Sequence, residues 1–268
     1  VWDLSHFAII LLPHHLPSFT SSPTLHFLSP STSPPLPHPD CYKIRAHRVE
    51  ERLLSLNAIT IPAQTKQPAK GLIVLLHGWG ANCQDLLGLA EFMDLGDYQL
   101  VFPDAPFVHP YNPVGKMWYD LPQDYRFMGT AQFGDRPDLT QSREQLTNFL
   151  NSLTDQLQIP FSRTILGGFS QGGAMTLDVG LQLPLAGLMV LSGYLHAPPR
   201  LQTTDTPAVF IVHGRQDMVV PVQAAHRTRD SLQALGVPVQ YQEYPFMGHE
   251  IQPVVLEQLQ TFVKEILD

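Results

Sequence analysis

The chain has 268 residues, 44% of them hydrophobic, which is enough to build the core of one large domain or two small ones. Lysine and arginine together number 16 against 24 aspartate and glutamate residues, giving a formal net charge of -8. This charge disfavours binding to nucleic acid or to an anionic membrane surface, because both attract basic proteins.

The N-terminal segment differs from the rest of the chain because it is rich in Pro, Ser, Thr and His. Such a segment buries too little apolar surface to fold, so we expect residues 1–41 to be disordered and residues 42–268 to form one domain. The apolar stretch FAIILL is cut by Pro13, which makes it too short for a membrane span, and it lacks the basic flank of a secretory signal. The irregular spacing of the histidines here favours a solvated tail over a metal site.

The two cysteines of the chain, Cys41 and Cys83, are far apart in the sequence and do not suggest a disulfide framework. A reducing compartment, and hence a cytoplasmic location, is expected. Cys83 lacks the GxCxG pattern of a nucleophile, so we interpret it as a small buried or half-buried residue. The sequence has no HExxH or paired CxxC motif, and no metal site is expected.

In residues 42–268, strand patterns alternate with helix patterns. Apolar runs predict strands at 71–77, 98–106, 164–169, 186–193, 208–214 and 237–244. Helical spacing predicts helices at 82–94, 138–158, 171–183, 222–235 and 253–267. The alternation predicts a mostly parallel sheet with helices on both faces.

Two helix starts and one insertion are specific enough to test. Asn82 is the expected N-cap of the first helix, and Asp138 with Gln141 is expected to form a capping box at the second. The stretch 107–135, rich in Pro, Gly and aromatic residues, is expected to be a long irregular insertion. Long loops on such sheets usually carry substrate contacts or a lid.

Ser170 lies in the sequence GFSQG, which fits the pattern GxSxG and falls where a predicted strand meets a predicted helix. In a nucleophile elbow this turn raises the serine hydroxyl above the sheet, and the flanking glycines avoid clashes between strand and helix. The serine also needs a base and a carboxylate, which in this fold follow it in the order acid, then histidine. We therefore interpret Ser170 as a nucleophile rather than as part of a packing turn.

The expected acid is Asp217, which follows the strand in VFIVHGRQDMVVP. At the carboxyl end of a strand its carboxylate would lie at the edge where open α/β sheets bind ligands. Asp104 and Asp178 remain alternatives, and Asp217 would serve only as a helix cap if one of them were the acid.

The expected base is His249 in EYPFMGHE, again after a strand. His213 lies at a strand end and His226 in a predicted helix, so both are interpreted as structural or exposed residues.

An oxyanion hole requires two backbone amides. The amide of Gln171 follows the serine at a helix N-terminus, where it faces developing negative charge. Gly78 and Gly80 in LLHGWGAN let the backbone turn, so that the amide of Trp79 can supply the second donor. His77 is expected to hold this turn through hydrogen bonds.

The motifs LLHGWGANCQDL, GFSQGGAM, VHGRQDMVVP and GHE, in this order, resemble the phospholipase/carboxylesterase family of α/β-hydrolases over residues 45–268. This family includes acyl-protein thioesterases and small bacterial carboxylesterases. The resemblance implies the α/β-hydrolase fold, a triad of Ser170, Asp217 and His249, and oxyanion amides from Trp79 and Gln171. The segment GKMWYDLP resembles the family's aromatic loop near the acyl pocket, which implies that Trp118 contacts substrate.

We therefore expect a serine carboxylesterase or thioesterase that needs no cofactor and acts on a small acyl ester, a lysophospholipid or an acylated protein. The alternatives are a hydrolase-fold protein that binds a small apolar ligand without catalysis, and a serine peptidase. Exposed Trp118, Tyr119 and Phe127 would line a dimer contact or an acyl channel, so a monomer and a homodimer both remain open.

Overall fold

The structure is a computed structural model, and it describes residues 47–48, 56–65, 68–121, 131–201 and 205–268. The expected disordered segment 1–41 lies outside the described residues, and so does Phe127. Among the residues described, no helix is long and apolar enough to cross a membrane.

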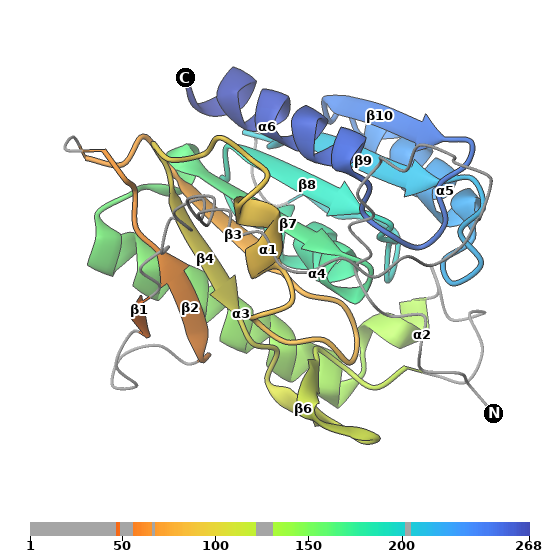
Figure 1. Ribbon diagram of the computed structural model, residues 1–268. Helices are drawn as coiled ribbons and strands as arrows, with labels where there is room; N and C mark the ends of the chain where they lie inside the picture. Colours follow the sequence, from red (N-terminus) through yellow and green to blue (C-terminus); the bar gives the residue numbers. More distant parts are fainter. Residues whose placement is uncertain (1–46, 49–55, 66–67, 122–130, 202–204) are drawn as a thin grey trace, which may run out of the picture.

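A mixed sheet forms the centre of the molecule (Figure 1). Its described strands lie in the order β1 (His47–Arg48), β2 (Ala58–Ile61), β4 (Gln99–Pro103), β3 (Leu72–Leu76), β7 (Thr164–Phe169), β8 (Gly187–Leu191), β9 (Ala208–Gly214) and β10 (Val239–Tyr244). All neighbours from β4 to β10 run parallel, whereas β1 and β2 pair antiparallel with each other and β2 with β4. The predicted mostly parallel sheet is confirmed, while the two antiparallel strands were not predicted.

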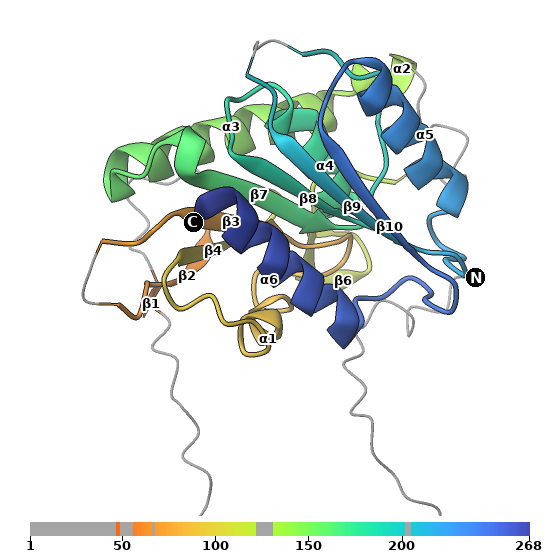
Figure 2. The same cartoon turned by 90° about the horizontal axis from the view of Figure 1, so that it is seen from above.

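Helices cover both faces of the sheet (Figure 2). They are α1 (Leu87–Ala90), α2 (Ala131–Gly134), α3 (Pro137–Leu157), α4 (Gln171–Gly180), α5 (Val222–Ala234) and α6 (Pro253–Leu267), with a short 3₁₀ turn at Phe161–Arg163. Figure 2 places α3, α4 and α5 on one face and α1 and α6 on the other. The layers are those of an α/β-hydrolase fold.

The core is divided by the sheet because successive side chains of a strand point to opposite faces. Leu72, Val74 and Leu76 of β3 pack with α3 and α4, whereas Ile73 and Leu75 pack with α1 and α6. All five are buried, so β3 reads as a continuous apolar run rather than an alternating one.

The helix predicted over 82–94 is much shorter than expected, because only Leu87–Ala90 is helical. Asn82 does not cap it. Its side-chain oxygen instead accepts a hydrogen bond from the Gln84 amide, and the Asp85 carboxylate accepts one from the Asn82 amide. These bonds stabilise a run of turns that leads into the single helical turn.

The capping box predicted at the next helix is wrong. The helix α3 begins at Pro137, its N-cap residue is Arg136, and no side chain caps it. Asp138 lies within the first turn, where it accepts hydrogen bonds from the Leu139 amide and the Arg136 guanidinium. A proline at the first helical position fixes the start without a side-chain cap.

The stretch predicted to be irregular contains a β-hairpin. Strands β5 (Phe107–His109) and β6 (Asn112–Met117) pair antiparallel in a second small sheet, with a register shift between Val108 and His109. In Figure 1 the labelled strand β6 lies apart from the main sheet. Residues 122–130 of the same stretch lie outside the described residues.

Candidate active site

Ser170 lies in the turn between β7 and α4, as expected, and its backbone has φ 55° and ψ -115°. A Cβ atom at Gly168 would clash with the backbone of Gly172, and one at Gly172 would clash with Leu76. The turn therefore requires both flanking glycines. The side chain of Ser170 makes no capping bond to the helix, which leaves its hydroxyl for another partner.

That partner is His249, whose Nε2 lies 3.0 Å from Ser170 Oγ. On the other side of the ring, Nδ1 lies 2.8 Å from Asp217 Oδ2. The three residues follow β7, β9 and β10, whose carboxyl ends meet at one edge of the parallel sheet. The structure thus joins the three predicted residues in one continuous chain of hydrogen bonds.

The carboxylate of Asp217 accepts three hydrogen bonds. Its Oδ1 accepts from the amides of Val219 at 2.9 Å and Val220 at 2.7 Å, and its Oδ2 accepts from His249. Burial raises the pKa of Asp217, but the hydrogen bonds from His249 and Val220 outweigh it, and the pKa lies below its ordinary value. An ionised Asp217 holds the proton on Nδ1 of His249, so Nε2 is free to accept the serine proton.

The two alternative acids are occupied elsewhere. Asp104 accepts hydrogen bonds from the Asn57 side chain and the Cys83 amide, which ties the loop after β3 to that after β4. Asp178 on α4 pairs with Arg143 on α3.

His213 is a second histidine at Asp217, and its contact was missed in the sequence. It is fully buried, its Nε2 donates to the Val220 carbonyl at 2.8 Å, and the same nitrogen lies 3.4 Å from Asp217 Oδ2. Burial lowers the pKa of His213, so the ring is a neutral donor to the loop that holds the acid. Its position four residues before Asp217 was the available signal.

The two residues predicted to supply oxyanion amides belong to segments next to the serine. Gln171 is the first residue of α4, where backbone amides lack partners within the helix. Trp79 lies between Gly78, where an added Cβ would be 3.5 Å from that of Ser170, and Gly80, which has φ 80°. The loop carrying Trp79 therefore passes directly beside the serine.

His77 holds the start of this loop, as predicted. Its Nδ1 donates to the Gly78 carbonyl at 2.7 Å, and its Nε2 accepts from the Ala105 amide at 2.9 Å. Burial lowers the pKa of His77, which agrees with one donating and one accepting nitrogen.

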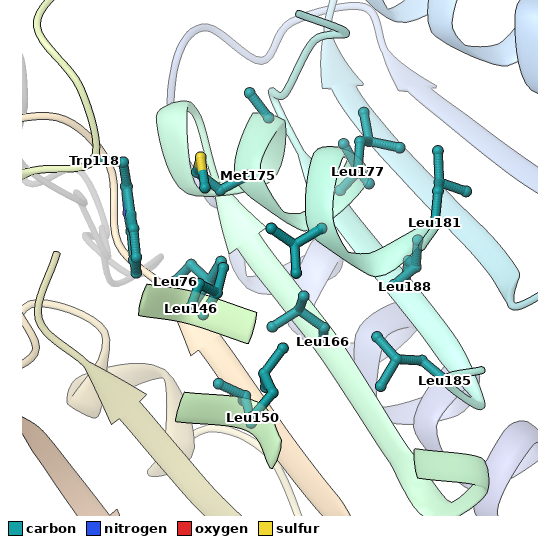
Figure 3. Close-up of a cluster of buried hydrophobic side chains, with 14 of the residues drawn as sticks. Leu76, Trp118, Leu146, Leu150, Leu166, Met175, Leu177, Leu181, Leu185 and Leu188 are labelled. Carbon is teal, nitrogen blue, oxygen red and sulfur yellow. The ribbon is translucent and has the colours of Figure 1, made fainter. Parts of the chain in front are cut away.

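Trp118 is not exposed, which corrects the expectation that it lines a channel or dimer contact; Tyr119 is fully buried as well. Figure 3 shows Trp118 among the core side chains, together with Leu76 and Met175. Its amide donates to the side chain of Gln171 at 2.9 Å, and its indole Nε1 donates to the His77 carbonyl at 3.1 Å. In this position Trp118 links Gln171 to the His77 backbone, and the structure does not support the expected substrate contact.

No metal centre accompanies the triad in the described part of the chain, where no group of three or more His, Cys, Asp and Glu side chains is arranged to hold an ion. Cys83 is buried beside the loop that carries Trp79.

A buried Ser–His–Asp chain at the carboxyl edge of a parallel sheet, with its serine in a strained strand-to-helix turn, defines a serine hydrolase of the α/β-hydrolase class. The family model described as Phospholipase/Carboxylesterase matches residues 57–267. The chain belongs to this family, and it is a serine hydrolase of the esterase type.

Curated relatives and solved structures agree with this assignment. The chain is 29% identical over 228 residues to acyl-protein thioesterase 1 of Emericella nidulans, covering 77% of this chain and 94% of the relative. It is 30% identical over 223 residues to acyl-protein thioesterase 1 of Eremothecium gossypii, covering 77% and 92%. The crystal structure of esterase PE8 superimposes with a TM-score of 0.70 and 33% identity, covering 79% of this chain and 99% of the other.

Proposed function

We propose that the chain hydrolyses carboxylic esters and thioesters through an acyl-enzyme intermediate, with Ser170 as nucleophile, His249 as general base and acid, and Asp217 as the orienting carboxylate. The observation that carries this proposal is the unbroken chain from Asp217 Oδ2 to His249 to Ser170 Oγ, with spacings of 2.8 and 3.0 Å. Both spacings lie within the range that proton transfer requires.

In the first step Ser170 Oγ attacks the acyl carbonyl while His249 Nε2 takes its proton. The amides of Trp79 and Gln171 stabilise the negative charge that develops on the carbonyl oxygen, and the protonated His249 then protonates the leaving alcohol or thiol. In the second step His249 activates a water molecule that attacks the acyl group on Ser170, and the acid is released. Asp217 stabilises the charged imidazole in both steps.

The proposed substrates are small acyl esters, lysophospholipids and acylated proteins. Acylated proteins are included because the relatives from Emericella nidulans and Eremothecium gossypii are named acyl-protein thioesterase 1. The low cysteine content supports a cytoplasmic location, and we propose a monomer or a homodimer.

The test is hydrolysis of p-nitrophenyl esters from acetate to palmitate, with Ser170→Ala as the comparison. Turnover should fall by about three orders of magnitude or more in the variant, while its thermal unfolding stays close to wild type. Wild-type turnover in Ser170→Ala would refute the assignment of the nucleophile.

Two further measurements separate the alternatives. A fluorophosphonate probe should label the wild type at Ser170; no labelling and no turnover would favour a protein that binds a small ligand without catalysis. Esters, thioesters and amides with the same acyl group should be cleaved with the amide slowest, and a preferred amide would identify a peptidase.

A further inference from the structure

The β5–β6 hairpin is joined to the loop that carries Trp79 by backbone hydrogen bonds. The Gly80 amide donates to the Lys116 carbonyl at 2.8 Å, and the Lys116 amide donates to the Ala81 carbonyl at 2.7 Å. Gly80 and Ala81, the two residues that follow Trp79, therefore pair with strand β6.

A side chain of the hairpin adds a third bond to the same loop. Asn112 Nδ2 donates to the Gly80 carbonyl at 3.1 Å, and its Oδ1 accepts from the Val114 amide at 3.3 Å. With these bonds both backbone polar groups of Gly80 are held by the hairpin. The peptide that follows Trp79 thus has its orientation fixed from outside its own loop.

Gly115 lets the two segments approach this closely. A Cβ atom at this position would clash with the Gly80 carbonyl oxygen and would lie 2.8 Å from Asn112 Nδ2. A side chain here would therefore push the hairpin and the loop apart. The neighbouring side chain of Val114 is 70% exposed and takes no part in the contact.

The hairpin also packs on Trp79 itself. His109 is buried, and its ring lies edge to face with the Trp79 ring at a centroid distance of 4.0 Å. Its Nδ1 accepts from the Tyr111 amide at 3.2 Å, which fixes the imidazole within the hairpin. The hairpin thus contacts the Trp79 side chain through His109 and holds the two residues that follow Trp79 through hydrogen bonds.

We propose that the β5–β6 hairpin is a positioning element of the oxyanion hole, and that Asn112 and Gly115 are the positioning residues through which it holds the Trp79 amide. The inference rests on the proposed function. It assigns the hairpin a role in stabilising the transition state, distinct from covering the acyl group. Removing a single oxyanion donor lowers kcat by about a hundredfold to a thousandfold, so displacing one donor should lower kcat by part of this amount.

The experiment compares Asn112→Ala and Gly115→Ala with the control Val114→Ala. Active sites are counted by the endpoint of fluorophosphonate labelling, so that kcat refers to folded, reactive enzyme. We expect kcat to fall about tenfold in Asn112→Ala and up to about a hundredfold in Gly115→Ala, with KM nearly unchanged and Val114→Ala close to wild type.

An alkyl boronic acid supplies a second readout, because its tetrahedral adduct with Ser170 places an anionic oxygen where the oxyanion forms. Its inhibition constant should rise by the same factor by which kcat/KM falls in each variant. Unchanged kcat per labelled site, or an equal loss in Val114→Ala, would overturn the positioning role. Absence of turnover and labelling in the wild type would instead refute the proposed function.

Discussion

Ser170, Asp217 and His249 lie together because each comes just beyond the carboxyl end of a strand, β7, β9 or β10. The parallel sheet brings these strand ends to one edge, so each of the three residues could be predicted from a local motif after its strand. Trp118 was not predictable in the same way. An aromatic residue in a Pro- and Gly-rich segment has the same sequence signature whether it covers a pocket or fills a core, and here packing of α3 and α4 decides that it is buried.

At this scale His213 offers a prediction about the acid loop. Replacing it by Leu removes the donor to the Val220 carbonyl and leaves that buried oxygen without this bond, which should lower stability by about 1–3 kcal/mol. Gln carries an amide nitrogen at a similar reach that can donate to the same carbonyl, so His213→Gln should recover much of the stability that Leu loses. Urea unfolding of both variants checks this, and equal destabilisation by Leu and Gln would contradict it.

Among the elements, the long apolar strands were predicted correctly and the connections were not. In NPVGK the proline and glycine interrupt any alternation of polar and apolar residues, so strand β6 has no periodic signal. What makes it a strand is pairing with the neighbouring strand β5 and with the loop after β3, and the second of these contacts joins residues that are distant in the sequence. The helix predicted over 82–94 proved too long because side-chain hydrogen bonds at Asn82 and Asp85 stabilise turns in place of helical hydrogen bonds.

A prediction at the element scale concerns the edge strand β10. Its Glu243 accepts hydrogen bonds from His226 of α5, from Arg215 and from Tyr241, and these bonds, that of His226 first, lower its pKa to about 2 from the ordinary 4.5. A lowered carboxyl pKa stabilises the fold above pH 4.5, and this contribution is lost as the pH falls toward 2. The difference in unfolding free energy between wild type and Glu243→Gln should therefore be largest above pH 4.5 and should decrease as the pH falls toward 2.

The difference in unfolding free energy between wild type and Glu243→Gln is measured by unfolding at several pH values between pH 6 and pH 2. Glu257→Gln, at an exposed position of α6, is the control. A difference for Glu243→Gln that does not change with pH would show that the substitution acts through packing alone.

In the whole molecule, the hydrophobic cores on both faces of the sheet stabilise the fold, and the candidate active site lies at the carboxyl edge of the sheet. Leu166 of β7 is fully buried against α3 and α4 (Figure 3), so Leu166→Ala should cost about 2–5 kcal/mol of unfolding free energy. Because its side chain is apolar and takes part in none of the hydrogen bonds of the site, kcat per labelled active site should stay near wild type. Leu235→Ala, at a position 44% exposed, should change stability by less than about 0.5 kcal/mol.

The alternation of strands and helices was sufficient to predict the layers, but the antiparallel strands β1 and β2 were missed. β2 is only four residues long and its burial does not alternate, so it has no strand pattern of its own. It is held by antiparallel pairing with β4, and β1 pairs with β2.

The parallel pairing of β10 with β9 also bears on how the protein acquires activity as it folds. His249 is placed beyond β10, whose partner strand lies more than twenty residues earlier, and Ser170 lies two strands further across the sheet. Such non-local parallel pairings form slowly, because the chain loses conformational entropy when it closes the loop, before the stabilising contacts between the strands are made. A refolding chain can therefore regain helical structure well before its serine meets its histidine, which makes the reactive hydroxyl a late marker of the native state.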